Sequence, residues 1–299
     1  MKVLICDPTD PKALELIADE GIEVVNQSDI TPEQLLETIP DFPCMVVRSR
    51  TKVTREVIDA GKSLKAVVRA GVGLDNIDVE YAKSKGVQVL NTPSASTQSV
   101  AELTVGYLFA LARHIPQMTA SMKAGKWEKK SFLGTELSGK TLGLIGSGRI
   151  GQAVADRAIA MGMRVIAYDP YVDNLPGVEL VELDELFKSA DYISLHVPHT
   201  DETHNILDAS SFSKMKDGVR IINCGRGGTI DEDALYSALE SGKVAGAALD
   251  VFAEEPPEDS KLFDLPGVIG SPHVGAGTKE AKARVGQVAA EKVIGALKG

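Results

Sequence analysis

Short apolar runs alternate with amphipathic stretches along the first third of the chain. The apolar runs are rich in β-branched residues and cover 2–7, 23–26, 44–49, 65–70 and 88–92. Between them lie stretches with helical spacing, such as 11–20 and 54–60, which end at Gly21 and Gly61. Strands that alternate with helices predict a parallel sheet. Residues 1 to about 95 are therefore expected to form a domain of their own.

A longer helical pattern separates this part from a second strand series. Residues 96–124 are apolar over most of the helix circumference up to Ile115, and Pro116 is expected to bend or break the helix. This helix is more apolar than packing on one domain face requires. That favours two interpretations about equally, an interdomain or subunit contact and a buried core helix. Six strands are expected after it, the number of a complete dinucleotide-binding sheet, at 142–145, 164–169, 192–197, 220–224, 245–251 and 268–271.

Residues 141–169 read as one strand, glycine turn, helix and second strand. Gly146, Gly148 and Gly151 follow the first strand in the spacing G-x-G-x-x-G, a pattern that is informative only in this context. These glycines permit a tight turn, the approach of a pyrophosphate to the backbone and close packing of the helix. Asp169 ends the second strand, where a carboxylate accepts hydrogen bonds from ribose hydroxyls and repels a 2′-phosphate. The stretch therefore predicts NAD as cofactor in preference to NADP.

The bulk composition excludes several classes of protein. The 299 residues are 43% hydrophobic and 25% charged, which suits a globular protein of two domains. A net charge of −10 argues against nucleic-acid and acidic-membrane binding, and no signal peptide or membrane-spanning run is present. The three cysteines, Cys6, Cys44 and Cys224, are far apart, so neither a disulfide framework nor a metal site is indicated, and a cytoplasmic location is expected.

Three polar residues each follow a predicted strand, where ligands bind in open parallel sheets. They are Arg226 in NCGRGG, Glu255 in DVFAEEPP and His273 in SPHVGAG. An arginine can grip a carboxylate and polarise a neighbouring carbonyl, while a histidine can exchange a proton with the carbonyl oxygen. The glutamate can hold and orient the imidazole. Each could alone be a surface residue, but beside a cofactor motif the three indicate the acid–base site of a carbonyl reduction. The turn from His196 to Pro198 is expected to pass the cofactor.

These motifs together resemble the D-2-hydroxyacid dehydrogenase family over essentially the whole chain. The resemblance is carried by VRSRTKVT, VVRAGVGLDNID, GSGRIG, NCGRGG, AALDVFAEEPP and SPHVGAGT. It implies an α/β fold of two Rossmann-like domains: a doubly wound six-stranded parallel NAD-binding sheet (96–277) and a smaller flavodoxin-like substrate domain (1–95 and 278–299). It implies the same catalytic set and NAD contacts from Arg149, Ile150, Asp169, Val197, Pro198, Cys224, Gly225, Asp250, His273, Gly275 and Ala276.

The resemblance also implies where the substrate binds. In the family a substrate carboxylate lies against backbone N–H groups of a glycine loop, here Gly71, Val72 and Gly73, and such a loop can form an anion nest without side chains. A phosphate needs cations, and Arg48, Arg50, Lys52 and Arg69 are available near strand ends. The resemblance singles out Arg48 and Arg69. Relatives often carry Thr where this chain has Val72, and Arg where it has Lys129, so a hydroxyl and a bidentate phosphate grip are absent.

The similarity is greatest to family members that act on a phosphorylated substrate. It implies NAD-dependent oxidation of 3-phospho-D-glycerate to 3-phosphohydroxypyruvate, the first step of L-serine biosynthesis, by a homodimer that forms around the long central helix. Feedback through a C-terminal regulatory domain is not expected. The alternatives are a glyoxylate or hydroxypyruvate reductase or another D-2-hydroxyacid dehydrogenase, and, from another class, an NAD-sensing corepressor. A formate dehydrogenase fits less well, because there the histidine pairs with Gln in place of Glu255.

Overall fold

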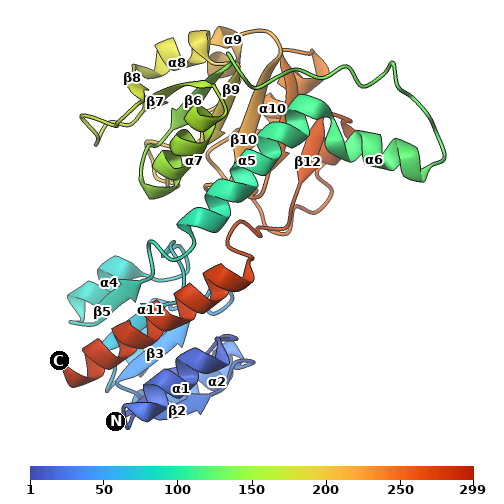
Figure 1. Cartoon of the computed structure of the whole chain (residues 1–299). Helices are drawn as coiled ribbons and strands as arrows, with labels where there is room; N and C mark the ends of the chain where they lie inside the picture. Colours follow the sequence, from blue (N-terminus) through green and yellow to red (C-terminus); the bar gives the residue numbers. More distant parts are fainter. The chain divides into compact units, whose positions relative to one another are not determined.

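The computed structural model describes all 299 residues and consists of two compact α/β units (Figure 1). Unit 1 comprises Met1–Ser96 and Ala276–Gly299, and unit 2 comprises Thr97–Gly275. These bounds lie within two residues of the domain limits expected from the sequence. The chain thus leaves unit 1 once and returns to it at its C-terminal end.

The sheet of unit 1 has five parallel strands in the order β2-β1-β3-β4-β5. This order changes direction between β1 and β3, which is the switch point of a flavodoxin-like sheet. Each predicted strand is present, and most are one or two residues shorter than the apolar run: β1 (Lys2–Ile5), β2 (Glu23–Asn26), β3 (Cys44–Val47), β4 (Ala66–Arg69) and β5 (Gln88–Asn91).

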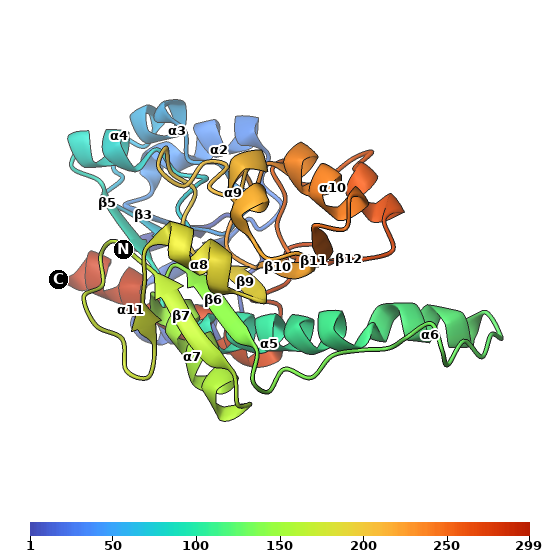
Figure 2. The same ribbon diagram turned by 90° about the horizontal axis from the view of Figure 1, so that it is seen from above.

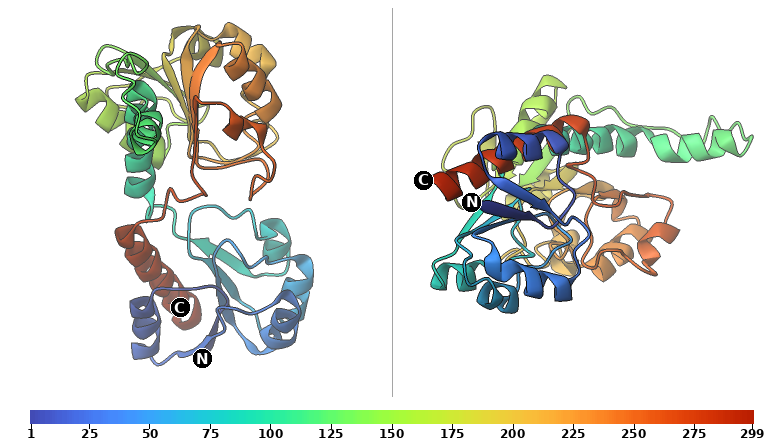
Figure 3. Two further views of the ribbon diagram at one scale, coloured as in Figure 1. Left: turned by 90° about the vertical axis from the view of Figure 1, so that its right-hand side faces the viewer. Right: turned by 90° about the horizontal axis from the view of Figure 1, so that it is seen from below.

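Helices cover both faces of this sheet (Figure 3). On one face α1 (Pro11–Asp19) lies beside the C-terminal α11 (Lys279–Lys298). The other face carries α2 (Pro32–Thr38), α3 (Arg55–Ala60), α4 (Val79–Ser84) and the short η1 (Ile39–Asp41). Local chemistry sets the helix starts. Thr31, for example, forms a capping box with Gln34, and Pro32 occupies the first turn.

The sheet of unit 2 has seven parallel strands in the order β12-β11-β10-β9-β6-β7-β8. The direction changes between β6 and β9, as in a doubly wound dinucleotide-binding sheet. The expected number of six is one short because β8 is a two-residue edge strand, too short for a hydrophobic run. The strands are β6 (Thr141–Ile145), β7 (Arg164–Tyr168), β8 (Glu179–Leu180), β9 (Tyr192–Leu195), β10 (Val219–Asn223), β11 (Val244–Leu249) and β12 (Val268–Gly270).

The long helical pattern after Ser96 forms two helices. The first, α5 (Thr97–Arg113), packs with α7 (Arg149–Ala160) on one face of the sheet and contributes Val100, Leu108 and Leu111 to the core. The second, α6 (Ile115–Lys123), begins after His114, whose φ of 54° breaks the helix next to Pro116. The opposite face carries α8 (Leu183–Ser189), α9 (Ala209–Lys214) and α10 (Glu232–Glu240), with the short η2 (Lys261–Asp264) (Figure 2). None of these helices combines the length and apolarity needed to cross a bilayer.

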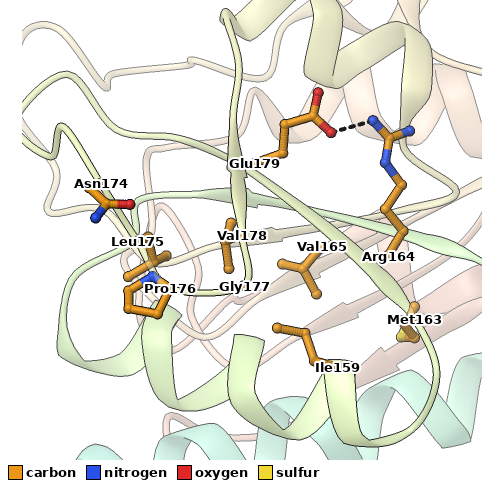
Figure 4. A pocket seen from close by; sticks show the side chains of 10 residues that line it. All are labelled: Ile159, Met163, Arg164, Val165, Asn174, Leu175, Pro176, Gly177, Val178 and Glu179. Carbon is orange, nitrogen blue, oxygen red and sulfur yellow. Dashed lines mark hydrogen bonds and ion pairs between the residues drawn. The ribbon is translucent and has the colours of Figure 1, made fainter.

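A shallow hollow in unit 2 lies at the wrong edge of the sheet for a cofactor. Ile159, Pro176 and Glu179 help to line it, and Glu179 forms an ion pair of 2.6 Å with Arg164, which also lines it (Figure 4). Arg164 is the first residue of β7, so the hollow lies at the amino end of that strand. Ligands of doubly wound sheets bind beyond the carboxyl ends.

Candidate active site

The glycine turn after β6 is shaped by contacts that only glycine allows. Gly146 has φ of 91°, and a Cβ there would lie 2.8 Å from Cγ1 of Val197. A Cβ on Gly151 would lie 2.3 Å from the carbonyl oxygen of Gly146, so the start of α7 presses on the turn itself. Gly148 is different, because a Cβ there meets no atom within 4 Å. Its backbone faces open space, as a pyrophosphate contact requires.

The amino terminus of α7 is available to an anion. Gly148 is its N-cap and supplies no side-chain hydrogen bond, and Arg149 and Ile150 form the exposed to half-buried first turn. Uncapped N–H groups and the positive end of the helix dipole attract phosphate. The turn and the helix start therefore fit the pyrophosphate of a dinucleotide.

Asp169 both follows β7 and holds the glycine turn. Its Oδ2 accepts hydrogen bonds from the backbone N–H of Ser147 at 2.8 Å and from the Ser147 hydroxyl at 3.1 Å. Its Oδ1 accepts the N–H of Tyr171 at 3.0 Å. A carboxylate has about four acceptor positions, so one remains for a ribose hydroxyl. The role of Ser147, which lies between two motif glycines, was missed from the sequence.

The turn after β9 lies against the glycine turn at the switch point. Val197 contacts Gly146, whereas Pro198 is exposed. His196 donates or accepts a hydrogen bond of 2.9 Å with Ser194, and the buried ring has its pKa lowered by desolvation to about 4. The imidazole of His196 is therefore neutral at physiological pH, so no unpaired positive charge is buried at this position.

The three proposed catalytic residues lie in loops after three neighbouring strands. Arg226 follows β10, Glu255 follows β11 and His273 follows β12.

The loop that carries Arg226 is fixed by two hydrogen bonds. The carbonyl oxygen of Arg226 accepts them from the Asn223 amide at 2.9 Å and from the Thr229 hydroxyl at 2.7 Å. A Cβ on Gly227 would lie 1.6 Å from the carbonyl oxygen of Phe252, so this loop packs directly on the segment that leads to Glu255.

Glu255 and His273 form a hydrogen-bonded pair. Oε2 of Glu255 lies 2.8 Å from Nδ1 of His273, and Oε1 accepts the backbone N–H of Phe252 at 3.2 Å. The carboxylate is thus held at both oxygens and fixes the Nδ1–H tautomer of the imidazole. Nε2 is then the nitrogen that can exchange a proton with a ligand. The side chains of His273 and Glu255 keep 49% and 38% of their surface accessible, as reaction with a diffusing substrate requires.

Asp250 is a buried carboxylate at the centre of this edge, with 1% of its surface exposed. Oδ1 accepts hydrogen bonds from the Ser271 hydroxyl and from the N–H of Val274, and Oδ2 accepts the N–H of Gly275 at 2.7 Å. One acceptor position remains on Oδ2 for a donor from a cofactor. The structure therefore places Asp250 as a clamp on the turn after His273, a role that sequence reasoning did not identify.

The remaining predicted cofactor residues are dispersed around the same edge. Cys224 is buried at the end of β10, and burial raises the pKa of its thiol to about 12. The N–H of Gly225 donates to the Asn223 side chain at 3.0 Å. Gly275 is buried and ends unit 2, whereas Ala276 is exposed and opens the C-terminal segment of unit 1.

The predicted substrate residues of unit 1 gather at the carboxyl edge of its sheet. Asp7, which follows β1 and is 1% exposed, accepts hydrogen bonds from the N–H of Arg48 and from the side chains of Arg50 and Thr51. The Asn76 amide donates to the carbonyl oxygens of Arg48 and Thr51, at 2.7 Å and 2.6 Å. The loop after β3 is therefore tied to the loop after β4. This role of Asp7 was not predicted from the sequence. Asp7 nevertheless follows a strand, which is the same pattern that indicated the catalytic residues.

Arg69 and Gly71 are in direct contact. Gly71 has φ of 156°, and a Cβ there would lie 1.3 Å from a guanidinium nitrogen of Arg69. The guanidinium thus lies across the glycine loop. Val72 is held by the Asn91 amide, which donates to its carbonyl oxygen at 2.6 Å, and Gly73 is half-buried beside it. A cation and a glycine loop at one strand end suit an anionic ligand.

The four basic side chains of this region differ in availability. Arg50 donates to Asp7 at 3.0 Å and to the carbonyl oxygens of Cys6 and Ser28, both at 2.6 Å. It is therefore committed to the fold. Arg48 makes one side-chain hydrogen bond, to the carbonyl oxygen of Pro8 at 3.2 Å, and Lys52 is exposed.

The seven-stranded sheet, its glycine turn and the acid–base pair define a dinucleotide-dependent oxidoreductase. The family model of the D-isomer specific 2-hydroxyacid dehydrogenase, NAD binding domain, matches residues 105–275. The chain belongs to this family and is an NAD-dependent 2-hydroxyacid dehydrogenase.

The relatives carry two different substrate names. A hydroxypyruvate reductase of Thermotoga maritima is 54% identical, and the match covers 98% of this chain and 97% of the relative. A D-3-phosphoglycerate dehydrogenase of Methanocaldococcus jannaschii is 52% identical over 100% of this chain, which spans 58% of that longer relative. Among solved structures, a protein from Thermus thermophilus is similar with a TM-score of 0.93 and 36% identity, covering 100% of this chain and 97% of the other.

Proposed function

We propose that the protein oxidises 3-phospho-D-glycerate to 3-phosphohydroxypyruvate with NAD, the first step of L-serine biosynthesis. The observation that carries the proposal is the pair of arginines beside the glycine loop of unit 1. Arg69 lies across Gly71, and the Arg48 loop is tied to the same loop through Asn76. The phosphate of such a substrate needs cations of its own, in addition to the groups that bind its carboxylate. The D-3-phosphoglycerate dehydrogenases among the relatives support this assignment.

In this proposal each catalytic residue has one task. Gly146, Gly148 and Asp169 would hold NAD, which would supply the acceptor for the hydride that leaves C2 of the hydroxy acid. Arg226 binds the substrate carboxylate and polarises the C2 oxygen. Nε2 of His273 takes the hydroxyl proton during oxidation and returns it to the carbonyl oxygen during reduction. Glu255 holds Nδ1–H and stabilises the imidazolium that results, through the 2.8 Å hydrogen bond.

The phosphate role of Arg48 separates this proposal from its main alternative. Replacing Arg48 by alanine is expected to lower kcat/KM for 3-phosphohydroxypyruvate by about 10- to 100-fold, the range for loss of a charge-assisted hydrogen bond. The rate with hydroxypyruvate, which has no phosphate, should change by less than about threefold, because no charged partner is lost. Steady-state NADH consumption with both substrates gives the two ratios.

Lys52→Ala is the matched control, because Lys52 is an exposed cation of the same loop. It should affect both substrates little and equally. Equal losses for both substrates in Arg48→Ala would remove the phosphate role from Arg48.

The second candidate is a hydroxypyruvate reductase. It is favoured by the Thermotoga maritima relative, which this chain covers over 97% of its length. A wild-type preference for hydroxypyruvate over its phosphorylated form, measured side by side with glyoxylate and pyruvate, would establish this alternative. Both candidate functions use the same catalytic residues. They differ only in whether the cations of unit 1 bind a phosphate on the substrate.

We also propose that the protein is a homodimer that forms around the α5 and α6 helices. In unit 2, α6 and the segment that follows it extend away from the sheet (Figure 2). Together with the end of α5, this extension exposes five large apolar side chains, which a second copy of the chain would bury: Phe109, Ile115, Met122, Trp127 and Leu133.

For the location of the protein in the cell we propose the cytoplasm. The three cysteines are buried and none of them forms a disulfide, which supports a reducing compartment.

The most exposed of the five apolar side chains test the dimer. Trp127 and Leu133 keep 80% and 88% of their surface accessible, so replacing both by alanine should leave the folded chain intact. The double variant is expected to shift the mass measured by light scattering from dimer toward monomer at micromolar concentration. Tyr171→Ala is the control, since Tyr171 is 89% exposed elsewhere in unit 2. A monomeric wild-type protein contradicts the proposal.

A further inference from the structure

We propose that Tyr107 and Ser271 are positioning residues that act through Asp250 to hold the turn carrying His273. The proposal deepens the proposed function and rests on His273 as the acid–base group. Tyr107 lies on α5, whereas Ser271 and His273 follow β12, so the connection joins two elements far apart in the chain. No motif in the sequence contains both ends of it.

The connection is a continuous chain of hydrogen bonds. The Tyr107 hydroxyl is hydrogen-bonded to the Ser271 hydroxyl, and the Ser271 hydroxyl donates to Oδ1 of Asp250. The same Oδ1 accepts the N–H of Val274 at 2.8 Å, and Oδ2 accepts the N–H of Gly275 at 2.7 Å. Asp250 therefore holds the turn from both sides of His273, and Tyr107 anchors it to a core helix.

The direction of the protons follows from the acceptors. A serine hydroxyl has one proton, and the carboxylate of Asp250 can only accept, so Ser271 donates to Asp250. The Tyr107 hydroxyl must then donate to Ser271. Tyr107 is 6% exposed, and burial raises its pKa to about 12, which keeps it protonated as a donor throughout the physiological range.

The turn needs such restraint because its backbone is not intrinsically favourable. His273 has φ of 50°, in the left-handed region that only a few per cent of residues other than glycine occupy, with histidine, asparagine and aspartate the most frequent among them. Its backbone N–H donates to the carbonyl oxygen of Ser271 at 3.0 Å, and no other backbone hydrogen bond holds the residue. If the Asp250 clamp moves, the His273 ring moves with the turn, and its alignment with substrate changes more than substrate binding does.

The tether is tested by removing single hydroxyl groups. Tyr107→Phe and Ser271→Ala are each expected to lower kcat about 3- to 30-fold, as misplacement of a proton donor predicts, with KM for the keto acid within about twofold. The double variant should lose little more than Ser271→Ala alone, because both changes break the same chain. Ser271→Thr keeps the hydroxyl and should restore most of the rate.

Tyr192→Phe is the matched control. Tyr192 is fully buried in the same unit and its hydroxyl bonds to Thr135 at 3.3 Å, outside the chain described above. Like Tyr107→Phe, Tyr192→Phe removes one hydroxyl oxygen from a buried tyrosine. A loss of kcat in Tyr192→Phe equal to that in Tyr107→Phe, or a parallel rise of KM in the tether variants, would mean that the hydroxyls support only the fold and would overturn the proposal.

Hydrogen exchange provides a readout that needs no substrate. In the substrate-free protein, Tyr107→Phe and Ser271→Ala are expected to speed amide exchange in residues 271–275, because the N–H groups of Val274 and Gly275 are held by Asp250. Unchanged exchange there overturns the tether even if turnover falls. If the wild-type protein reduces none of the tested keto acids, the proposed function fails, while the exchange rates still decide whether the tether exists.

Discussion

Replacing His273 by alanine is expected to lower turnover by about 10²- to 10⁴-fold, the range for loss of a general acid–base group. The physical reason is the geometry at Nδ1, where Glu255 at 2.8 Å fixes the tautomer and leaves Nε2 to exchange the proton. Alanine leaves no group there that can do so. NADH affinity should stay within a fewfold of wild type, because the glycine turn lies after a different strand. Turnover is measured by NADH consumption and affinity by fluorescence titration.

The two adjacent glutamates provide a sharp control. Glu255→Gln removes the negative charge beside the imidazole and should lower turnover, whereas Glu254→Gln changes an exposed neighbour outside the pair. Equal losses of turnover in the two variants would show that turnover depends on the negative charge of this surface and not on the hydrogen bond between Glu255 and His273. A His273→Ala variant that turns over near the wild-type rate would remove His273 from the mechanism.

Alanine at Gly148 and at Gly151 is expected to separate cofactor binding from stability. At Gly148 the added Cβ meets no protein atom within 4 Å, so the melting temperature should hardly change. The methyl group would occupy the space where a pyrophosphate approaches the backbone, and NADH affinity should fall by about 10- to 1000-fold. At Gly151 the Cβ would lie 2.3 Å from the carbonyl oxygen of Gly146, so the turn itself must shift.

Gly151→Ala should therefore lose both stability and affinity. Forcing an atom into a packed contact costs about 1–3 kcal/mol, which is measurable by urea unfolding without cofactor. Gly106 lies within α5, and a Cβ there meets nothing within 4 Å, so Gly106→Ala is the control and should reduce neither property. If Gly148→Ala binds NADH as tightly as wild type, the dinucleotide does not approach this turn.

Much of the fold follows from local patterns along the chain. Strands such as β3 and β6 were predictable because they are buried on both faces and thus form nearly continuous apolar runs. Helix starts at Thr31 and the break at Pro116 follow from single residues whose effect is confined to one turn of backbone. The strand β8 was missed because two residues carry no periodicity, and only its pairing with β7 makes it a strand.

The sites depended on the sequence in a different way. By itself the sequence predicted the cofactor turn and the three strand-end residues Arg226, Glu255 and His273, since a parallel sheet brings all its carboxyl ends to one edge. The tertiary structure alone decided which side chains those residues contact. Asp7 commits Arg50 to the fold, and Tyr107 reaches Asp250 through Ser271, because these partners come from elements brought together only by folding. Hydrogen bonds act over about 3 Å in space, whatever the separation along the chain.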